Sequence, residues 1–289
     1  MRLICKNCKD QFSNLKSAYP YNTIFNGKKF SFLKCSLCKI TSIYPNLDSF
    51  DIDKLYNTDN YQSKFYSNLN QLENKNTLNY INKYIKKNSS VLDYGCGNGS
   101  LLNEISKITK NLFGVDTYVN NKIMTNTNIK YYNYLNFFRN NNEKFDIIIL
   151  RDVTEHLNEP NLLLIKLLKN LNKKGIIYIE GPAEKELSLV NIFIHIYAYF
   201  KDLKSHKNNF APYHVNYYSL KTKKDYLKRL KNLKVVYSKT YETGWPYNNA
   251  GFIKNIISNI SKTIYLIIKL NYFKIDYGNR FIIILKNVV

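Results

Sequence analysis

The sequence predicts an α/β protein built on a doubly wound, largely parallel sheet, and three observations support this fold class. From residue 91 onward, short apolar segments typical of strands alternate with segments of helical periodicity. A glycine-rich turn over residues 93–99 follows the first of these strands and precedes a helical segment. The chain has 289 residues, 45% of them hydrophobic, which is enough for one such core with a small accessory module.

The individual elements follow from the order of the apolar runs. We predict strands over residues 91–94, 112–115, 129–132, 145–150, 175–180, 234–238 and 281–285. Helices are expected over residues 101–108, 162–171 and 220–230, with Asn158 as a cap of the second one and Pro160 in its first turn. Residues 48–60 read as a polar connector, and a leading helix is expected from residue 65 to residue 85.

Four of the five cysteines form two identical pairs, Cys5 with Cys8 and Cys35 with Cys38. The two-residue spacing lets both thiolates of a pair face one ion, and the intervening residues can form a hairpin that joins the pairs. Four thiolates leave no open coordination position, so we expect a structural Zn²⁺ that stabilises a module over residues 1–47. Two disulfides or four unrelated thiols are the alternative, which a reducing cytoplasm disfavours.

The formal net charge of +22 is the most unusual bulk property. Such a charge can mark a nucleic-acid or membrane partner, or a preference for anionic substrates such as nucleotide-linked sugars. However, only five of the 43 basic residues are arginine, and the lysines are spread along the chain, as a codon bias would also produce. The first residues lack the apolar run of a secretory signal, and the apolar stretches 187–200 and 252–270 are interrupted by polar residues, so we expect a cytoplasmic protein without a transmembrane span.

The glycine-rich turn carries the most specific signal. Its sequence resembles the first motif of class I S-adenosylmethionine-dependent methyltransferases, an acidic residue followed by three alternating glycines. The carboxylate of Asp93 suits a cofactor with a cationic amino-acid end and would repel a pyrophosphate. The resemblance implies a Rossmann-like sheet and cofactor contacts from Asp93, Tyr94, Gly95, Cys96, Gly97 and Gly99.

Two further strand ends extend this resemblance, which covers about residues 91–230. Asp116 and Thr117 end the second strand, where an acid commonly accepts hydrogen bonds from the ribose hydroxyls. Proteins that bind NAD share that feature, so Asp93 is the residue that favours S-adenosylmethionine. The stretch 145–157 resembles the fourth strand of small-molecule methyltransferases, which implies that Leu150 and Arg151 line the cofactor pocket.

The end of that stretch also suggests metal-assisted chemistry. Asp152, Glu155 and His156 resemble the acid-x-x-Glu-His pattern of quinone-pathway O-methyltransferases, where such residues can hold a divalent ion such as Mg²⁺ near the acceptor. A general base is the simpler mechanism. Of the remaining histidines, His214 lies in the segment that points into the substrate pocket in this family and is our candidate base, whereas His195 should be packed and His206 solvated.

The acceptor class follows from resemblance alone. The cysteine pairs, the Ile43-Tyr44-Pro45 segment, Leu55-Tyr56 and Tyr61 resemble bacterial methyltransferases that act on nucleotide-linked sugars and surface-polysaccharide precursors. The chain has no room for the C-terminal domain of the sugar C-methyltransferases, so O- and C-methylation both stay open. An RNA methyltransferase and a catalytically silent binding module are the competing functional classes.

Two insertions complete the expected methyltransferase domain over residues 89–289. Residues 183–217 hold an apolar, aromatic segment that could cover the substrate, pack as an ordinary helix or contact a membrane. Residues 243–277 hold an amphipathic helix, which we expect to pack on the sheet, with docking on a lipid surface as the alternative.

Overall fold

The computed structural model describes residues 3–10, 13–56, 70–117, 126, 128–140, 142–205, 211–230, 232–248, 250–271 and 275–288. Its main feature is a sheet of seven strands in the order β10-β11-β8-β7-β4-β5-β6. These strands are β4 (Ser90–Tyr94), β5 (Asn111–Asp116), β6 (Ile129–Asn133), β7 (Phe145–Arg151), β8 (Leu171–Pro182), β10 (Leu233–Tyr241) and β11 (Arg280–Asn287). All seven predicted strands are confirmed. Strands β4 to β8 run parallel, whereas β11 is antiparallel to β8 and β10 is antiparallel to β11.

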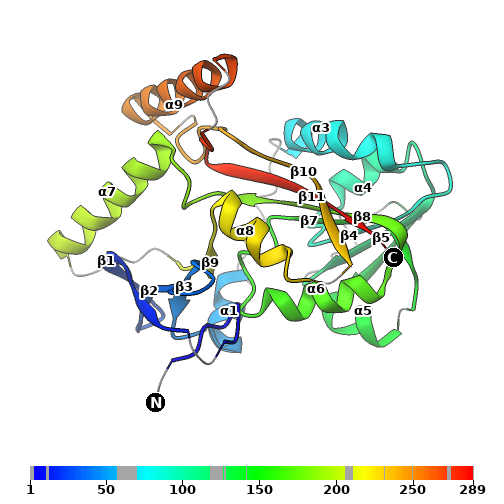
Figure 1. Ribbon diagram of the computed structural model, residues 1–289, viewed down its shortest axis with the longest axis horizontal. Coiled ribbons are helices and arrows are strands. Elements are labelled where there is room, and N and C mark those ends of the chain that lie inside the picture. The colour runs from blue at the N-terminus through cyan, green and yellow to red at the C-terminus, as the bar shows by residue number, and fades with distance from the viewer. Residues whose placement is uncertain are drawn as a thin grey trace.

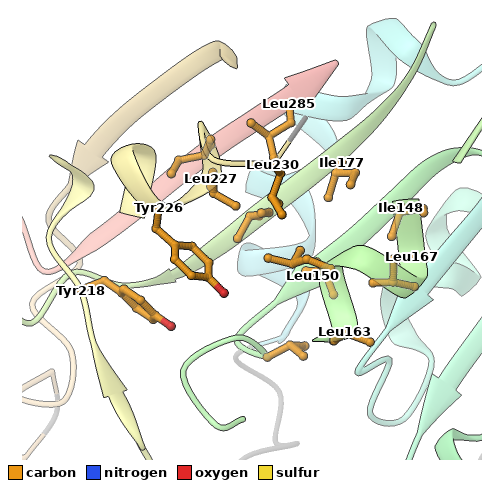
Figure 2. Packing of buried hydrophobic residues seen from close by; sticks show 14 of the residues in the cluster. Ile148, Leu150, Leu163, Leu167, Ile177, Tyr218, Tyr226, Leu227, Leu230 and Leu285 are labelled. Carbon is orange, nitrogen blue, oxygen red and sulfur yellow. The ribbon is translucent and has the colours of Figure 1, made fainter. Parts of the chain in front are cut away.

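Both faces of the sheet are buried, because successive strand residues point to opposite sides. On one face, Leu92, Ile148 and Ile177 join a core with helix residues, part of which Figure 2 shows. On the other face, their neighbours Val91 and Ile147 join a second core. This double burial explains why the strands read as continuous apolar runs in the sequence.

The helices lie on both faces of the sheet (Figure 1). They are α1 (Ser49–Tyr56), α3 (Asn70–Ile81), the 3-10 helix η1 (Asn82–Tyr84), α4 (Ser100–Ile105), α5 (Tyr134–Asn140), α6 (Pro160–Lys169), α7 (Leu189–Ser205), α8 (Leu220–Leu227) and α9 (Phe252–Leu270). Residues of α3 and α4 belong to one core, and residues of α5, α6 and α8 to the other. None of the helices among the described residues combines the length and apolarity that a bilayer crossing requires.

A second, smaller sheet has the order β1-β2-β3-β9. Its strands are β1 (Leu15–Phe25), β2 (Lys28–Cys35), β3 (Thr41–Tyr44) and β9 (Asn216–Tyr217). Asn26 and Gly27 both have positive φ, which matches the tight turn that joins the antiparallel strands β1 and β2. The hairpin expected between the cysteine pairs is therefore present. Because β9 comes from the insertion over residues 183–217, the N-terminal sheet is joined directly to the segment that carries His214.

Two local expectations were wrong. Helix α1 occupies most of the segment predicted as a polar connector, and it packs through Leu55 and Asp51, which are both fully buried. Glu159, not Asn158, precedes α6, and the Asn158 side chain donates instead to the Leu47 carbonyl oxygen. The predicted leading helix is present as α3 over Asn70–Ile81, and residues 65–69 of the prediction lie outside the described residues.

The amphipathic helix α9 also differs from expectation. It contacts α7 rather than lying flat on the sheet, and Figure 1 shows both helices together at one end of the molecule. The buried residues of α9 are Ser258 and Ser261, whereas most of its apolar side chains are exposed.

Candidate active site

The glycine-rich turn between β4 and α4 adopts a conformation that requires its glycines. Gly95, Gly97 and Gly99 all have positive φ. A Cβ atom on Gly95 would lie 2.4 Å from Val153 Cγ2, so no side chain fits there without displacement. The amides of Gly95 and Cys96 donate to the Val115 carbonyl oxygen at 2.7 and 3.0 Å, which ties the turn to the end of β5.

Asp116 is held at the opposite side of this turn. Its Oδ2 atom accepts a hydrogen bond from the Gly97 amide at 2.9 Å, and the Thr117 hydroxyl donates to its Oδ1 atom at 3.1 Å. The carboxylate and the turn are therefore fixed relative to each other. The Asp116 carboxylate therefore remains at the carboxyl end of β5, close to the glycine-rich turn.

Asp93 is 3% exposed at the end of β4. Burial raises its pKa to about 6, and the positive charge of Arg151 partly opposes that effect. A buried carboxylate next to the turn would be stabilised by a bound cation. Tyr94, the next residue, is half-buried and packs its ring against Phe137 and Phe138.

Tyr131 on β6 is a feature of the turn that the sequence did not indicate. A Cβ atom on Gly99 would lie 2.3 Å from the Tyr131 hydroxyl oxygen, and Gly114 faces the same ring. The hydroxyl is buried and has no hydrogen-bond partner within the described part of the chain. An unpartnered buried hydroxyl at this place is an available contact for a ligand.

Two of the predicted pocket residues have buried side chains. The side chain of Leu150 is fully buried in the core, where Figure 2 shows it near Leu163 and Leu167, so only its main chain is left for a ligand contact. Cys96 is 7% exposed and packs in the second core. Arg151 donates from Nη1 to Asn74 Oδ1 at 2.8 Å, which links the end of β7 to α3.

An ion-pair network joins the residue after β7 to the strands β8 and β11. Arg280 Nη2 donates to both carboxylate oxygens of Asp152, at 2.8 and 2.9 Å, and lies 3.3 Å from Glu180 Oε1. The Tyr178 and Tyr241 hydroxyls also donate to Glu180. Although burial by itself raises the pKa of Asp152, the Arg280 guanidinium holds it below its usual value. Asp152 is therefore already paired, which removes it from the predicted metal-binding pattern.

Glu155 and His156, the other two residues of the predicted metal-binding pattern, lie close to His214. One ligand atom each from Glu155, His156 and His214 all lie within 4.8 Å of one another. The amides of Val215 and Asn216 donate to the Glu155 carbonyl oxygen at 2.7 and 3.0 Å, which brings the His214 segment to the end of β7. Sequence positions 155 and 214 therefore form one cluster in the fold.

The two histidines of this cluster have opposite charge preferences. Burial and the nearby His214 lower the pKa of His156 to about 4, and its Nδ1–H donates to the Tyr213 carbonyl oxygen at 2.7 Å. His214 Nδ1 lies 2.5 Å from Glu184 Oε1. Burial opposes protonation of His214, but the charge and hydrogen bond of Glu184 outweigh burial and raise its pKa to about 9.

Glu155 completes the cluster as a neutral group. Its side chain is fully buried, and burial followed by the charge of Asp152 raises its pKa to about 8. Its Oε1 atom has no hydrogen-bond partner among the described residues. Sequence reasoning identified Glu155, His156 and His214 but missed Glu184, because a glutamate at the start of an insertion carries no motif.

The four paired cysteines form a compact cluster in the N-terminal module. Cys5 Sγ lies 3.6 Å from Cys38 Sγ, Cys8 Sγ lies 3.8 Å from Cys35 Sγ, and all four sulfur atoms lie within 4.8 Å of one another. Zn–S bonds of about 2.3 Å in a tetrahedron place sulfur atoms about 3.8 Å apart, so the four residues fit a zinc ion. None of the cysteines forms a disulfide.

His195 has other partners than the cluster of Glu155, His156 and His214. His195 packs against the Tyr19 ring at 4.5 Å between centroids, and its Nδ1 lies 2.6 Å from the Tyr21 hydroxyl, which agrees with a packed rather than a catalytic residue. His206 lies outside the described residues.

Comparison with known proteins identifies the family. Residues 66–237, more than half of the chain, match the family model described as a methyltransferase domain. The ubiquinone biosynthesis O-methyltransferase of Bartonella tribocorum (strain CIP 105476 / IBS 506) is 29% identical over 100 residues. This match covers 32% of the chain and 40% of that relative, so the chain spans less than half of the curated relative's length.

Two solved structures show a similar arrangement. A SAM-dependent methyltransferase from Archaeoglobus fulgidus is 20% identical with a TM-score of 0.49, and the match covers 83% of this chain and all of that one. The N-methyltransferase NodS from Bradyrhizobium japonicum WM9 is 11% identical with a TM-score of 0.48, over 82% of this chain and 97% of that one. Both TM-scores are below 0.5. The match of residues 66–237 to the family model shows that the chain belongs to the methyltransferase domain family.

Proposed function

We propose that the chain transfers a methyl group from S-adenosylmethionine to a small molecule. The observation that carries this proposal is the placement of two sites at one edge of the sheet. The turn over residues 93–99 comes at the end of β4. Glu155 and His156 follow the adjacent strand β7, and His214 joins them from the segment before β9. Ligands of open α/β sheets bind outside the carboxyl ends of the strands, so both sites can face one cofactor and one acceptor.

The residues of the turn would hold the cofactor, which supplies an electrophilic methyl group. In this proposal Asp93 would bind the cationic amino acid, Asp116 would accept from the ribose hydroxyls, and the Tyr131 hydroxyl would be an additional donor. The glycines let the ligand approach the main chain closely. Fixing both reactants in line is the main contribution that a protein makes to such a transfer.

His214 is the proposed general base. Glu184 is bonded to Nδ1, so Nε2 is the nitrogen available to an acceptor hydroxyl. As the acceptor oxygen forms its bond to the methyl carbon and the sulfur–carbon bond breaks, the hydroxyl proton passes to Nε2. His214 must first lose the proton that Glu184 stabilises, so this mechanism predicts a rate that increases with pH up to about 9.

The proposed acceptor is an anionic, sugar-like molecule such as a nucleotide-linked sugar or a surface-polysaccharide precursor. Lys185 lies next to Glu184 and is partly buried, and burial lowers its pKa. Its Nζ atom is 4.4 Å from the Tyr19 ring centroid. A cation and aromatic rings beside the proposed base support an acceptor that combines negative charge with a flat or sugar-like ring. O- and C-methylation fit this site equally.

The donor set does not fit Mg²⁺. This ion prefers oxygen ligands, whereas Glu155, His156 and His214 offer two imidazoles and one carboxyl group, and Asp152 is paired with Arg280. We therefore derive no step through Mg²⁺. We propose a structural Zn²⁺ at the four paired cysteines, whose sulfur spacing supports it.

Replacing His214 with alanine tests the mechanism. We expect turnover of a nucleotide-sugar acceptor library with labelled S-adenosylmethionine to be lost, while binding of S-adenosylhomocysteine is unchanged. Lys228→Ala is the control, because Lys228 forms an exposed ion pair with Asp225 after α8 and does not belong to the cluster. Unchanged turnover in His214→Ala would refute the base assignment.

A further inference from the structure

Helix α9 packs on the protein through its polar side. Ser261 Oγ donates to Glu242 Oε2 at 3.0 Å and lies 2.9 Å from the Tyr277 hydroxyl oxygen, while Ser258 Oγ donates to Asn248 Oδ1 at 2.5 Å. These two serines are the buried residues of the helix. A helix that only packs on a protein core buries its apolar side, so this orientation is the reverse of the usual one.

The apolar side of α9 faces outward. Phe252 is 82% exposed, Ile253 is 72% exposed and Leu270 is 74% exposed. The neighbouring helix α7 adds further exposed apolar residues. We call the following set the α7–α9 surface: Ile192, Phe193, Ile196, Tyr197, Phe200, Leu203, Phe252, Ile253, Ile256, Ile260, Leu266, Ile267 and Leu270. An exposed set of this size on two contacting helices indicates an apolar partner.

The charges of α9 indicate what that partner is. The helix contains Lys254, Lys262 and Lys269 and no acidic residue. By helical periodicity the three lysines lie on the same side as the two serines, opposite the stripe of exposed isoleucines. This distribution, apolar on one side and lysine-rich on the other, is typical of helices that lie in the interface of an anionic bilayer.

The same charges disfavour a second copy of the chain as the partner. Each chain carries a formal net charge of +22, so pairing two copies would bring two strongly positive molecules together. An anionic lipid surface is complementary both to the apolar side chains and to the lysines.

We propose that the α7–α9 surface docks the protein on an anionic lipid bilayer, with α9 lying parallel to the membrane plane. The proposal does not depend on methyl transfer. Figure 1 shows α9 on the outside of the molecule, at the end where α7 also lies, so it can reach a flat surface. Trp245, the single tryptophan of the chain, lies shortly before α9 and is 49% exposed, which places an aromatic residue of the kind enriched at membrane interfaces next to the helix.

Vesicle flotation with the full chain tests the docking. Vesicles of phosphatidylcholine alone are compared with vesicles containing phosphatidylglycerol, and Trp245 emission is recorded in parallel. We expect the protein to bind the anionic vesicles and its tryptophan emission to shift to shorter wavelength. Binding to neutral vesicles, or to anionic vesicles in 0.5 M salt, should be at least tenfold weaker. Each lysine near an anionic surface contributes about 1 kcal/mol, or about fivefold in affinity, and salt screens this attraction. Equal binding to both vesicle types, or binding to neither, overturns the proposal.

Matched variants separate the helix from the rest of the surface. Ile253, Ile260 and Ile267 form one stripe at seven-residue spacing, and the triple change to glutamine keeps a good helix former at each position. We expect at least tenfold weaker vesicle binding with an unchanged thermal midpoint. The control is Leu162→Gln with Ile165→Gln on α6, where both residues are 46% exposed, and this variant should bind as the wild type does.

Two outcomes overturn the assignment to α9. One is a triple variant that binds anionic vesicles as tightly as the wild type. The other is a wild type that sediments as a dimer and a triple variant that sediments as a monomer, because the surface would then be an interface between two copies of the chain.

Discussion

The charge state of His214 is the most specific electrostatic feature of the proposed active site. The imidazole Nδ1 and Glu184 Oε1 are 2.5 Å apart, and their side chains are only 23% and 20% exposed. This contact raises the pKa of His214 from 6.5 to about 9. Glu184→Gln keeps the shape of the side chain and removes its charge, so the pKa should return toward its usual value.

The size of the effect follows from the shift. A difference of about 2.5 pH units corresponds to roughly 3 kcal/mol at 1.36 kcal/mol per unit. At pH 7 about 1% of His214 would be neutral in the wild type, against about three quarters in Glu184→Gln. Because the folded-state pKa is raised, the pair stabilises the fold fully below about pH 6.5, and this contribution is lost as the pH rises through about 9.

NMR titration of the imidazole groups measures this directly. The chain has four histidines, so the ring signals can be assigned with single His→Asn variants. We expect His214 to titrate near pH 9 in the wild type and no higher than about 6.5 in Glu184→Gln, because burial, which lowers the pKa, then acts without the opposing charge of Glu184. His156, whose pKa is about 4, serves as an internal reference in both proteins.

Two results would refute the reasoning. One is a wild-type spectrum in which no imidazole titrates above pH 8. The other is a Glu184→Gln variant in which the titration of His214 is unchanged. Urea unfolding at pH 6 and at pH 10 gives an independent check, since the variant should be less stable than the wild type at pH 6 and equally stable at pH 10.

Three further predictions concern the metal, the ion pair and the turn. Elemental analysis should show that Cys35→Ser reduces the zinc content from one ion per chain to nearly none, and the thermal midpoint should decrease. Cys96→Ser is the control and should retain the zinc. Zinc retained in both variants would contradict the site at the four paired cysteines. Arg280→Met should lower the free energy of unfolding in urea by about 1–3 kcal/mol, because the buried carboxylate of Glu180 and the partly exposed carboxylate of Asp152 both lose their guanidinium partner, and an unchanged free energy of unfolding would count against the network. Gly95→Ala should abolish S-adenosylhomocysteine binding in calorimetry, because the new Cβ atom meets Val153 at a residue with φ of 86°, and wild-type affinity would show that the turn tolerates a side chain.

The sheet could be predicted from the sequence because its signals are local. Each central strand is a continuous apolar run, since both faces of the sheet are covered by helices. The turn after β4 could also be located, because only glycine readily adopts the positive φ of Gly95, Gly97 and Gly99. The same holds for the cysteine pairs, whose spacing within each pair brings two sulfur atoms to one side.

The partners of the site residues could not be predicted, because they lie far apart in the sequence. Arg280, at the start of β11, reaches Asp152 because β11 lies next to β8, and the other neighbour of β8 is β7, which ends just before Asp152. Glu184 reaches His214 across the whole of α7, and no local pattern relates the two residues. Neither pairing has a spacing or motif that a single sequence could show.

The orientation of α9 illustrates a different limit. Its periodicity correctly indicated an amphipathic helix, but periodicity does not say which side faces the protein. That choice is made by hydrogen bonds from Ser258 and Ser261 to Asn248 and Glu242, which are distant partners. Helix α1 was missed because residues 49–56 are short and mix polar with apolar residues, and Leu55 is their single large buried apolar residue.

Calorimetric titration with S-adenosylmethionine tests the central claim most directly. We predict one binding site per chain, no binding of NAD, and affinity about 10–100-fold lower in Asp116→Asn, which keeps an acceptor for the Gly97 amide but loses the charge that we propose to bind the ribose. Absence of heat with S-adenosylmethionine, or saturable binding of NAD in its place, would contradict the assignment of the turn over residues 93–99.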